Sequence, residues 1–390
     1  MRQYLKRAWG IVTEVDVDLI LDASGFSYGD QWSDIALIQT AKEAKRLNEN
    51  NKKYVFMPQA LGPFTRKDNQ KWSKVAFDNA SVVFARDTVS YQATKKVIRD
   101  YFDAMEASSP EKVHDVLQEY TSNDYLWRGV YPFREQQGAE TVADIFWTPL
   151  MTSITRMQRR QDIFIAGTNE ISGEQWVMSM GNFMGLFDHD WLGIRHTGKM
   201  VNLRYAEFNC VENGKITQTG LFIDIIGLMV QAGMNPLPPS TGAYFNYPGP
   251  RTHDGLVYDA VPEEDGIKTL ALVNRMVDDL SDLNASGSMG CPPEVLEKTW
   301  SKDMIWYGPA GIGASYTIPR YQEQHQLPFR ANLTDKKFEG HVCRFAEGNY
   351  ACFFGWPNLS NTPIGGWLGL PGGNVNAEMQ VVDVYRREGD

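Results

Sequence analysis

The apolar stretch Leu221–Gly233 contains one acidic residue, Asp224. A carboxylate among apolar side chains must find a partner, give up its charge or face a cavity. In a cavity, partial loss of hydration favours its protonated form near neutral pH, which suits a general acid or base. Alternatively, Asp224 is a hydrogen-bonded or solvated strand residue, and Leu221, Ile223 and Ile225 face the core. The sequence alone leaves both interpretations open.

A β-hairpin is expected to position Asp224. Asn213-Gly214 lies between two strand-like runs, which favours a two-residue type I′ turn. With regular pairing, Asp224 lies opposite Leu203. The residues expected on one face of this hairpin are Leu203, Tyr205, Glu207, Gln218, Phe222 and Asp224. A β-bulge would shift the pairing by one residue and reverse the faces.

The expected spacings decide which side chains can act together. Tyr205 would be the diagonal neighbour of Asp224, at about 7 Å between Cα atoms, and could contact the same ligand. Glu207 would lie roughly 13 Å from Asp224, at about 3.3 Å per residue. That distance is too long for the paired carboxylates of a glycosidase. The spacing therefore places Tyr205, but not Glu207, close enough to Asp224 to act on the same ligand.

Composition limits the class of ligand. The chain has 390 residues and a formal net charge of −10, which opposes binding to nucleic acid or anionic membranes. No apolar run approaches the roughly 20 residues that span a bilayer, so we expect a cytoplasmic protein. Four cysteines without a C-x-x-C pair indicate neither a zinc site nor a disulfide framework. Cys343 and Cys352 are expected to face each other across a hairpin as reduced thiols.

Residues 1–95 alternate short apolar strands with polar helical stretches, the pattern of an α/β fold. Strands are expected at Asp18–Asp22, Tyr54–Met57 and Ser81–Phe84, and helices near 33–49 and 67–78. Because the strands are apolar on both faces and separated by helices, a three-stranded parallel sheet is predicted.

Three segments of this region resemble a known family. Leu21–Asp30, Pro58–Phe64 and Ala85–Tyr91 look like the N-terminal half of polysaccharide pyruvyl transferases. The resemblance covers about a quarter of the chain, and no second α/β lobe follows it. It therefore implies a fragment or a relic of such an enzyme.

From about residue 96 the pattern changes, and two stretches of similar sequence follow each other. Each stretch is expected to place helices before long strands, which predicts α+β domains with helices packed on a curved antiparallel sheet. The expected boundaries are 96–235 for the first domain, 236–261 for a Pro-rich linker and 262–390 for the second domain. The matching segments are Asp124–Gly129 with Asp303–Gly308, Pro149-Leu150 with Pro328-Phe329, and Trp191–Ile194 with Trp367–Leu370.

Asp224 followed by Gly-Leu-x-x-Gln-x-Gly, within Gly214–Gly233, resembles the C-terminal strand of SnoaL-like polyketide cyclases in the nuclear-transport-factor-like superfamily. The resemblance implies tandem cone-like domains over residues 96–390. It also implies that Asp224 is the acid/base of an intramolecular aldol ring closure that needs no metal or other cofactor. For this chemistry we expect Tyr205 to be the catalytic hydrogen-bond donor that stabilises the enolate. The expected ligand is a small hydrophobic or aromatic carbonyl compound. The residues expected to line its pocket are Trp127, Phe146, Trp147, Glu207 and Phe222.

The second domain is expected to be incomplete, because the turn at Glu388-Gly389 arrives before the strand that would carry a second Asp. Asp383 aligns with Glu207. Trp306, Tyr307, Trp356 and Trp367 favour binding or packing over catalysis there. An exposed sheet edge predicts a homodimer or pairing of the two domains. The alternative function is a non-catalytic ligand-binding or dimerisation module.

Overall fold

The computed structural model describes residues 17–24, 28, 34–59, 64, 66–85, 88–286, 290–373 and 375–389. Parts of Leu21–Asp30, Pro58–Phe64 and Ala85–Tyr91, the segments that resemble pyruvyl transferases, lie outside these residues. The chain forms two compact units. Unit 1 is Met1–Thr94 with Gly173–Gln175, and unit 2 is Lys95–Ser172 with Trp176–Asp390.

Unit 1 contains a parallel sheet of three strands in the order β1-β2-β3, which confirms the α/β prediction. Its helix α2 buries Leu37, Ala41, Ala44 and Leu47, whose spacing of three and four residues makes one apolar stripe. This stripe belongs to the same core as Phe56 of the central strand. The elements are β1 (Leu19–Asp22), α2 (Asp34–Glu49), β2 (Lys53–Gln59), α3 (Lys67–Asp78) and β3 (Val82–Ala85).

The first half of unit 2 places helices before a six-stranded sheet of order β5-β4-β9-β8-β7-β6. The helices are α4 (Thr88–Ala107), α5 (Val113–Tyr120), α6 (Ala139–Val142), the π-helix η2 (Ala143–Trp147), α7 (Thr148–Ser153) and α8 (Ile225–Gln231). The strands are β4 (Thr121–Gly129), β5 (Arg134–Gln137), β6 (Ile154–Thr168), β7 (Gln175–Phe187), β8 (Met200–Glu212) and β9 (Lys215–Ile223).

The second half has a similar order of elements with a smaller sheet around the central strand β14. The strands β12 and β13 pair with one edge of β14, and β15 pairs with its other edge. Its helices are α9 (Glu263–Ala285), α10 (Pro293–Leu296), α11 (Ile318–Tyr321), the π-helix η3 (Gln322–Gln326), α12 (Leu327–Asn332) and the 3-10 turn η4 (Trp367–Gly369). Its strands are β10 (Ile305–Tyr307), β11 (Ala314–Tyr316), β12 (Leu333–Phe338), β13 (Cys343–Glu347), β14 (Tyr350–Pro363) and β15 (Ala377–Arg386). The mixed α+β class is as predicted.

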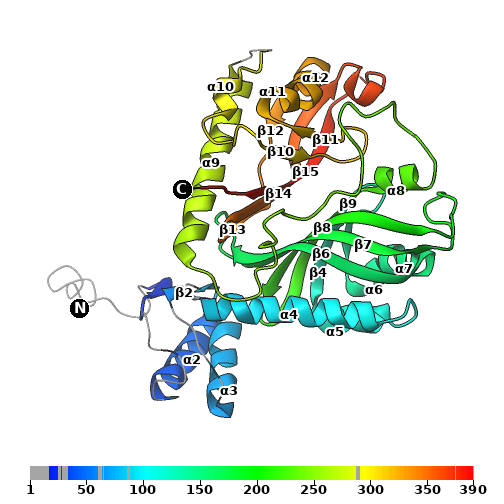
Figure 1. Ribbon diagram of the computed structural model, residues 1–390. Helices are drawn as coiled ribbons and strands as arrows, with labels where there is room; N and C mark the ends of the chain where they lie inside the picture. Colours follow the sequence, from blue (N-terminus) through cyan, green and yellow to red (C-terminus); the bar gives the residue numbers. More distant parts are fainter. Residues whose placement is uncertain are drawn as a thin grey trace. The chain divides into compact units, whose positions relative to one another are not determined.

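The six-stranded sheet and the four-stranded sheet of unit 2 pack face to face (Figure 1), while β10 and β11 form a separate two-stranded sheet. Phe208 and Phe222 of the first sheet meet Phe345 and Phe354 of the second in one buried cluster. A buried ion pair between Lys95 and Glu347 also joins the halves. Each half keeps a separate interior on the opposite face of its sheet, between the sheet and its own helices.

One local prediction is wrong. Cys343 pairs with Phe354 and Cys352 with Phe345, so the two thiols are not directly opposite each other on the hairpin, and no disulfide links any of the four cysteines.

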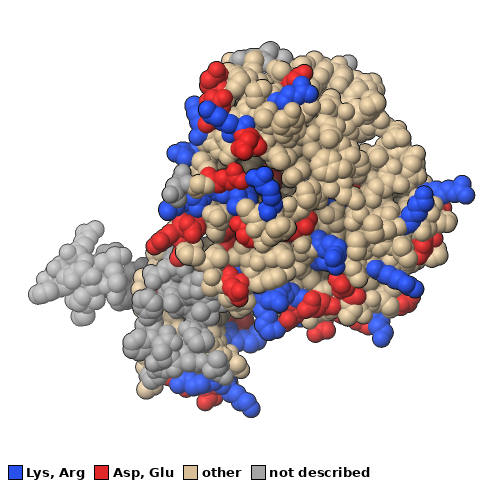
Figure 2. Space-filling model, viewed as in Figure 1, with Lys and Arg blue, Asp and Glu red and all other residues tan. Residues whose placement is uncertain are grey.

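Charged side chains of both signs are interspersed along α9 and α4 on the face shown in Figure 2. Within the described ranges, no helix combines the length and apolarity that crossing a bilayer requires.

Candidate active site

The hairpin that carries Asp224 begins as predicted and then changes register. Asn213 and Gly214 both have positive φ, 52° and 75°, as a type I′ turn requires. Glu212 pairs with Lys215 and Val211 with Ile216, but Cys210 pairs with Gln218, so Thr217 of β9 is the extra residue of a bulge. Beyond the bulge the pairing is shifted by one residue, so Tyr205 lies opposite Ile223 rather than Phe222. The predicted pairing of Asp224 with Leu203 is therefore wrong.

Asp224 lies directly after β9 and is the N-cap of α8. Its Oδ1 accepts a hydrogen bond of 2.8 Å from the backbone N–H of Gly227, which satisfies one of the free donors of the first helical turn. Its Oδ2 accepts a hydrogen bond of 2.9 Å from the backbone N–H of Ala310, in the second half. The carboxylate thus caps a helix of one half and holds a loop of the other.

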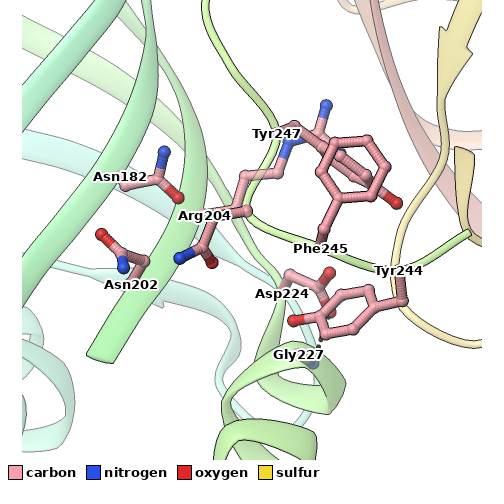
Figure 3. A pocket seen from close by; sticks show the side chains of 9 residues that line it. Asn182, Asn202, Arg204, Asp224, Gly227, Tyr244, Phe245 and Tyr247 are labelled. Carbon is pink, nitrogen blue, oxygen red and sulfur yellow. Dashed lines mark hydrogen bonds between the residues drawn. The ribbon is translucent and has the colours of Figure 1, made fainter. Parts of the chain in front are cut away.

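Asp224 also lines a small pocket between the first sheet and the linker (Figure 3). The pocket measures about 10 Å³, which is space for one water molecule. Amide, guanidinium, carboxylate and phenol groups all face it. The lining residues are Asn182, Asn202, Arg204, Asp224, Gly227, Tyr244, Phe245, Asn246 and Tyr247.

Arg204 is the cation of this pocket. Its Nη1 donates to the carbonyl of Tyr307 at 2.9 Å, and its guanidinium lies 4.8 Å from the ring centre of Tyr247. Burial lowers the pKa of Arg204, although Tyr247 and Asp224 counteract this. Burial raises the pKa of Tyr247 to about 12. At neutral pH the pocket therefore combines a charged guanidinium with neutral phenols.

Tyr205 lies on the other face of β8 and does not share this pocket. Neighbouring strand residues point to opposite faces, so Arg204 faces the linker and Tyr205 faces the interior of the first half. The Tyr205 hydroxyl is 2.9 Å from Ser179 Oγ, and its ring stacks on Phe183 with centroids 4.4 Å apart. The expectation that Tyr205 and Asp224 contact one ligand is not met by this arrangement.

The other predicted lining residues also divide between the two faces. Trp127, Phe146 and Trp147 share the buried core of the first half with Tyr205. Phe222 lies on the opposite face and contacts Trp356 of the second half, with ring centroids 5.6 Å apart. The bulge explains the separation, because a shift of one residue exchanges the faces of a strand.

Glu207 is held in a buried ion pair. Arg159 Nη1 donates to Glu207 Oε2 at 2.7 Å, and Asn209 donates to Oε1 at 3.1 Å. The guanidinium of Arg159 also lies 3.6 Å from the ring centre of Phe102. Since its charge is compensated and its oxygens are occupied, Glu207 stabilises the interior of the first half.

The sequence interpretation missed Arg204, Tyr244 and Tyr247. Arg204 precedes Tyr205 and therefore faces the opposite side, where the cavity lies. The signal in the linker was the pair of tyrosines in Tyr244-Phe-Asn-Tyr247, an aromatic run within a Pro-rich segment.

Comparisons with known proteins support the resemblance of the N-terminal region. The family model for polysaccharide pyruvyl transferase matches residues 1–103. No curated protein matches the chain.

Solved structures similar to the chain include a putative SnoaL-like polyketide cyclase from Jannaschia sp. CCS1, at 19% identity, covering 38% of this chain and 95% of that one, with a TM-score of 0.29. Another is IdmH, a putative polyketide cyclase from Streptomyces antibioticus, at 13% identity. The match covers 37% of this chain and 100% of that one, with a TM-score of 0.31. A third is an NTF2-like protein from Burkholderia xenovorans LB400, at 17% identity. The match covers 36% of this chain and 96% of that one, with a TM-score of 0.27. Each family resemblance thus covers only part of the chain.

Proposed function

We propose that the chain is a small-molecule enzyme that transfers a proton next to a carbonyl group, as the SnoaL-like resemblance implies. Asp224 is the acid/base of this proposal. The observation that carries it is the presence of Asp224 and Arg204 on one pocket, with neutral phenols beside them.

The two charged groups suit two parts of one reaction. A carboxylate can remove a proton from the carbon next to an ester or ketone. Negative charge then develops on the carbonyl oxygen, and a guanidinium in a partly buried site stabilises it. Arg204 takes the role expected of Tyr205. Each oxygen of Asp224 accepts one backbone hydrogen bond and retains a second lone pair for the substrate proton.

Substrate entry requires movement of the linker in this proposal. A pocket of about 10 Å³ does not admit a fused-ring ligand. Tyr244 and Tyr247 form the side of the pocket that belongs to the linker rather than to the sheet (Figure 3). Displacement of this segment opens the pocket and leaves the pairing of β8 with β9 intact, while the bridge between Ala243 and Ala314 anchors the start of the segment.

We also take the two halves of unit 2 to be tandem copies. The π-helices Ala143–Trp147 and Gln322–Gln326 lie 179 residues apart, and each follows a short α-helix. A proline occupies the start of the next helix in both halves. The second copy then completes the site of the first, because it supplies the Ala310 N–H that holds Asp224.

Deuterium exchange tests the proposed activity. We expect the protein to accelerate exchange of the α-protons of 2-tetralone, a flat bicyclic ketone, in D2O by about 100-fold or more over buffer. Asp224→Asn should abolish the acceleration and leave the fold intact, since Asn is also a good N-cap. Asp124→Asn, at an exposed carboxylate, is the matched control. Equal rates for the wild type and Asp224→Asn would rule the proposal out.

The face-to-face sheets favour a second candidate, a non-catalytic module in which each half covers the other. The buried cluster of Phe208, Phe222 and Phe354 is the observation in its favour. It predicts a monomer in light scattering and no exchange activity in the 2-tetralone experiment. A homodimer that dissociates only on unfolding would contradict intramolecular pairing.

A further inference from the structure

The strand β15 of the second half corresponds to β8 of the first half. β8 lies beside β7, and β15 lies beside β14. Asp383 of β15 follows Glu207 of β8 by 176 positions, the spacing of the matching segments Trp191–Ile194 and Trp367–Leu370. The other edges of the two strands differ. β9 pairs with β8, whereas no strand within the described ranges pairs with the second edge of β15. We call this second edge the open edge of β15.

The backbone of β15 presents hydrogen-bonding groups at the open edge. In an antiparallel pair, every second residue directs its N–H and C=O to the neighbouring strand. Just past the end of β15, the N–H of Arg387 donates to the carbonyl of Asn349 at 2.7 Å, in the register in which β15 pairs with β14. The backbone groups of Asp383 therefore point to β14, and those of Val382 and Val384 point to the open edge.

The same positions are paired in the first half. The N–H of Asp224 donates to the carbonyl of Arg204, so the alternation directs the backbone groups of Ala206 and Phe208 to β9. Residues 205–211 of β8 are all buried, whereas no residue of β15 is buried. Thus β15 lacks the cover that β9 gives to β8.

The open edge has an uncompensated carboxyl group on its interior face. Asp383 pairs with Phe353, which belongs to the cluster formed with α9, so both side chains face the helices. Glu207 has Arg159 as its counter-charge, whereas no ion pair of Asp383 occurs among the described residues. Asp383 is hydrogen-bonded to Tyr385, and burial raises its pKa to about 6. At neutral pH it is therefore mostly ionised.

The opposite face of β15 is apolar. Val382 and Val384 pack against the buried cluster that joins the two sheets. In the first half, β9 adds Phe222 to this cluster, where its ring lies 5.6 Å from that of Trp356. A strand at the open edge would extend the cluster if its residues beside Val382 and Val384 were apolar. This position thus favours apolar side chains on one face and a cation on the other.

The hairpin of β10 and β11 leaves the open edge uncovered. It corresponds to the hairpin of β4 and β5, from which β9 separates β8 in the first half. Within the described ranges, β10 and β11 pair with each other and not with β15. At the end of β10, Arg204 Nη1 already donates to the carbonyl of Tyr307. An added strand is therefore expected to pair with β15 rather than with β10.

We propose that the open edge of β15 binds an extended segment of a partner polypeptide, antiparallel to β15, with a Lys or Arg opposite Asp383 and apolar residues on either side of it. The backbone groups of Val382 and Val384 bind the backbone of this segment, as when a peptide adds a strand to a sheet. Asp383 and the residue opposite it form a non-hydrogen-bonded pair, in which side chains approach most closely. An inward-facing charge also disfavours strands that lack a counter-charge. This inference does not depend on the role proposed for Asp224.

A synthetic peptide based on β9 tests the edge. It has the sequence of Lys215–Ile223 with Val in place of Gly220 and Lys in place of Leu221, the residue that pairs with Glu207. We expect the fluorescently labelled peptide to bind saturably at neutral pH, as measured by anisotropy. Glu in place of the new Lys should weaken binding by about tenfold or more.

N-methylated peptides test strand pairing without any change to the protein. Methyl groups on the nitrogens at positions 220 and 222, whose N–H groups face β8 in the first half, should weaken binding by about tenfold or more. Methyl groups at positions 219 and 221 are the matched control. Because those N–H groups point away from this partner strand, binding should stay within about threefold.

The variant Asp383→Asn tests the counter-charge. It should weaken binding of the Lys peptide by about tenfold, and bind the peptide that keeps Leu at this position within about twofold of the wild type. Asp124→Asn, at an exposed carboxylate, should bind both peptides as the wild type does. A cooperative thermal transition shows that each variant is folded.

Three results would overturn the proposal. The first is no saturable binding of the Lys peptide, or equal binding of the two N-methylated peptides. The second is equal binding of the Lys peptide by the wild type and Asp383→Asn. The third is a homodimer in light scattering that excludes the peptide, because a second copy of the chain would then occupy the open edge.

Discussion

Glu207 and Asp383 lie at corresponding positions in the six-stranded and the four-stranded sheet of unit 2, but among the described residues only Glu207 has an ion-pair partner, Arg159 Nη1 at 2.7 Å. One interior is therefore closed by an ion pair and aromatic packing. The other keeps an uncompensated carboxyl group among polar side chains that lack partners. The first half of unit 2 thus has a packed core around an ion pair, and the second half has a more polar interior.

Removing one partner of the Glu207 ion pair should destabilise the protein more than removing both partners. Arg159→Met leaves a buried carboxylate without its cation, and the free energy of unfolding should fall by about 3–5 kcal/mol. The double variant Arg159→Met, Glu207→Met should recover much of this loss, because no charge then remains buried. Urea unfolding of the wild type, both single variants and the double variant measures the coupling. Additive losses would contradict the pairing.

Asp383 should make stability depend on pH. Its pKa is about 6 in the folded protein against an ordinary 3.8, so the folded state binds more protons than the unfolded state between these values. Stability should therefore fall as pH rises from 4 to 6, by at most about 3 kcal/mol. His325 and His341 act in the opposite direction, because burial lowers both pKa values to about 4.

The variant Asp383→Asn isolates this contribution. The difference in unfolding free energy, variant minus wild type, should increase between pH 4 and 6.5, while the histidine contributions largely cancel. Urea unfolding at several pH values gives this difference. A difference that does not change with pH would show that Asp383 has an ordinary pKa in the folded protein.

Asp224 should tolerate Asn better than Ala. Asp224→Asn keeps an oxygen for the Gly227 N–H, whereas Asp224→Ala leaves both that donor and the Ala310 N–H without this partner. The loss of an N-cap costs about 1 kcal/mol, and loss of the second contact adds to it. Thermal unfolding compares the two variants. Equal melting temperatures would contradict the capping role.

Local patterns predicted the elements more successfully than their pairing. The strands around Leu19–Asp22 and Lys53–Gln59 follow from apolar runs, and the turn at Asn213-Gly214 follows from residue type. The bulge near Cys210 has no comparable local signal, yet it moved Phe222 and Tyr205 to opposite faces. The grouping of Asp224 with Arg204 and Tyr247 depends on the linker, whose path is set by contacts distant in sequence.

The second half was underestimated for a related reason. The sequence interpretation looked for an acid on a final strand and found that strand missing. Asp383 was aligned with Glu207, but its environment depends on contacts distant in sequence. The counter-charge of Glu207 comes from Arg159 of β6, and the described residues bring no such partner to Asp383.

The rate of α-proton exchange in 2-tetralone, measured by proton NMR in D2O for the wild type and Asp224→Asn, tests the central claim most directly. The proposal predicts acceleration of about 100-fold or more by the wild type and by Asp124→Asn. It predicts the buffer rate for Asp224→Asn in a variant that remains folded, with a melting temperature lowered only by the loss of one of the two backbone contacts. Acceleration that persists in Asp224→Asn, or is absent from the wild type, would contradict it.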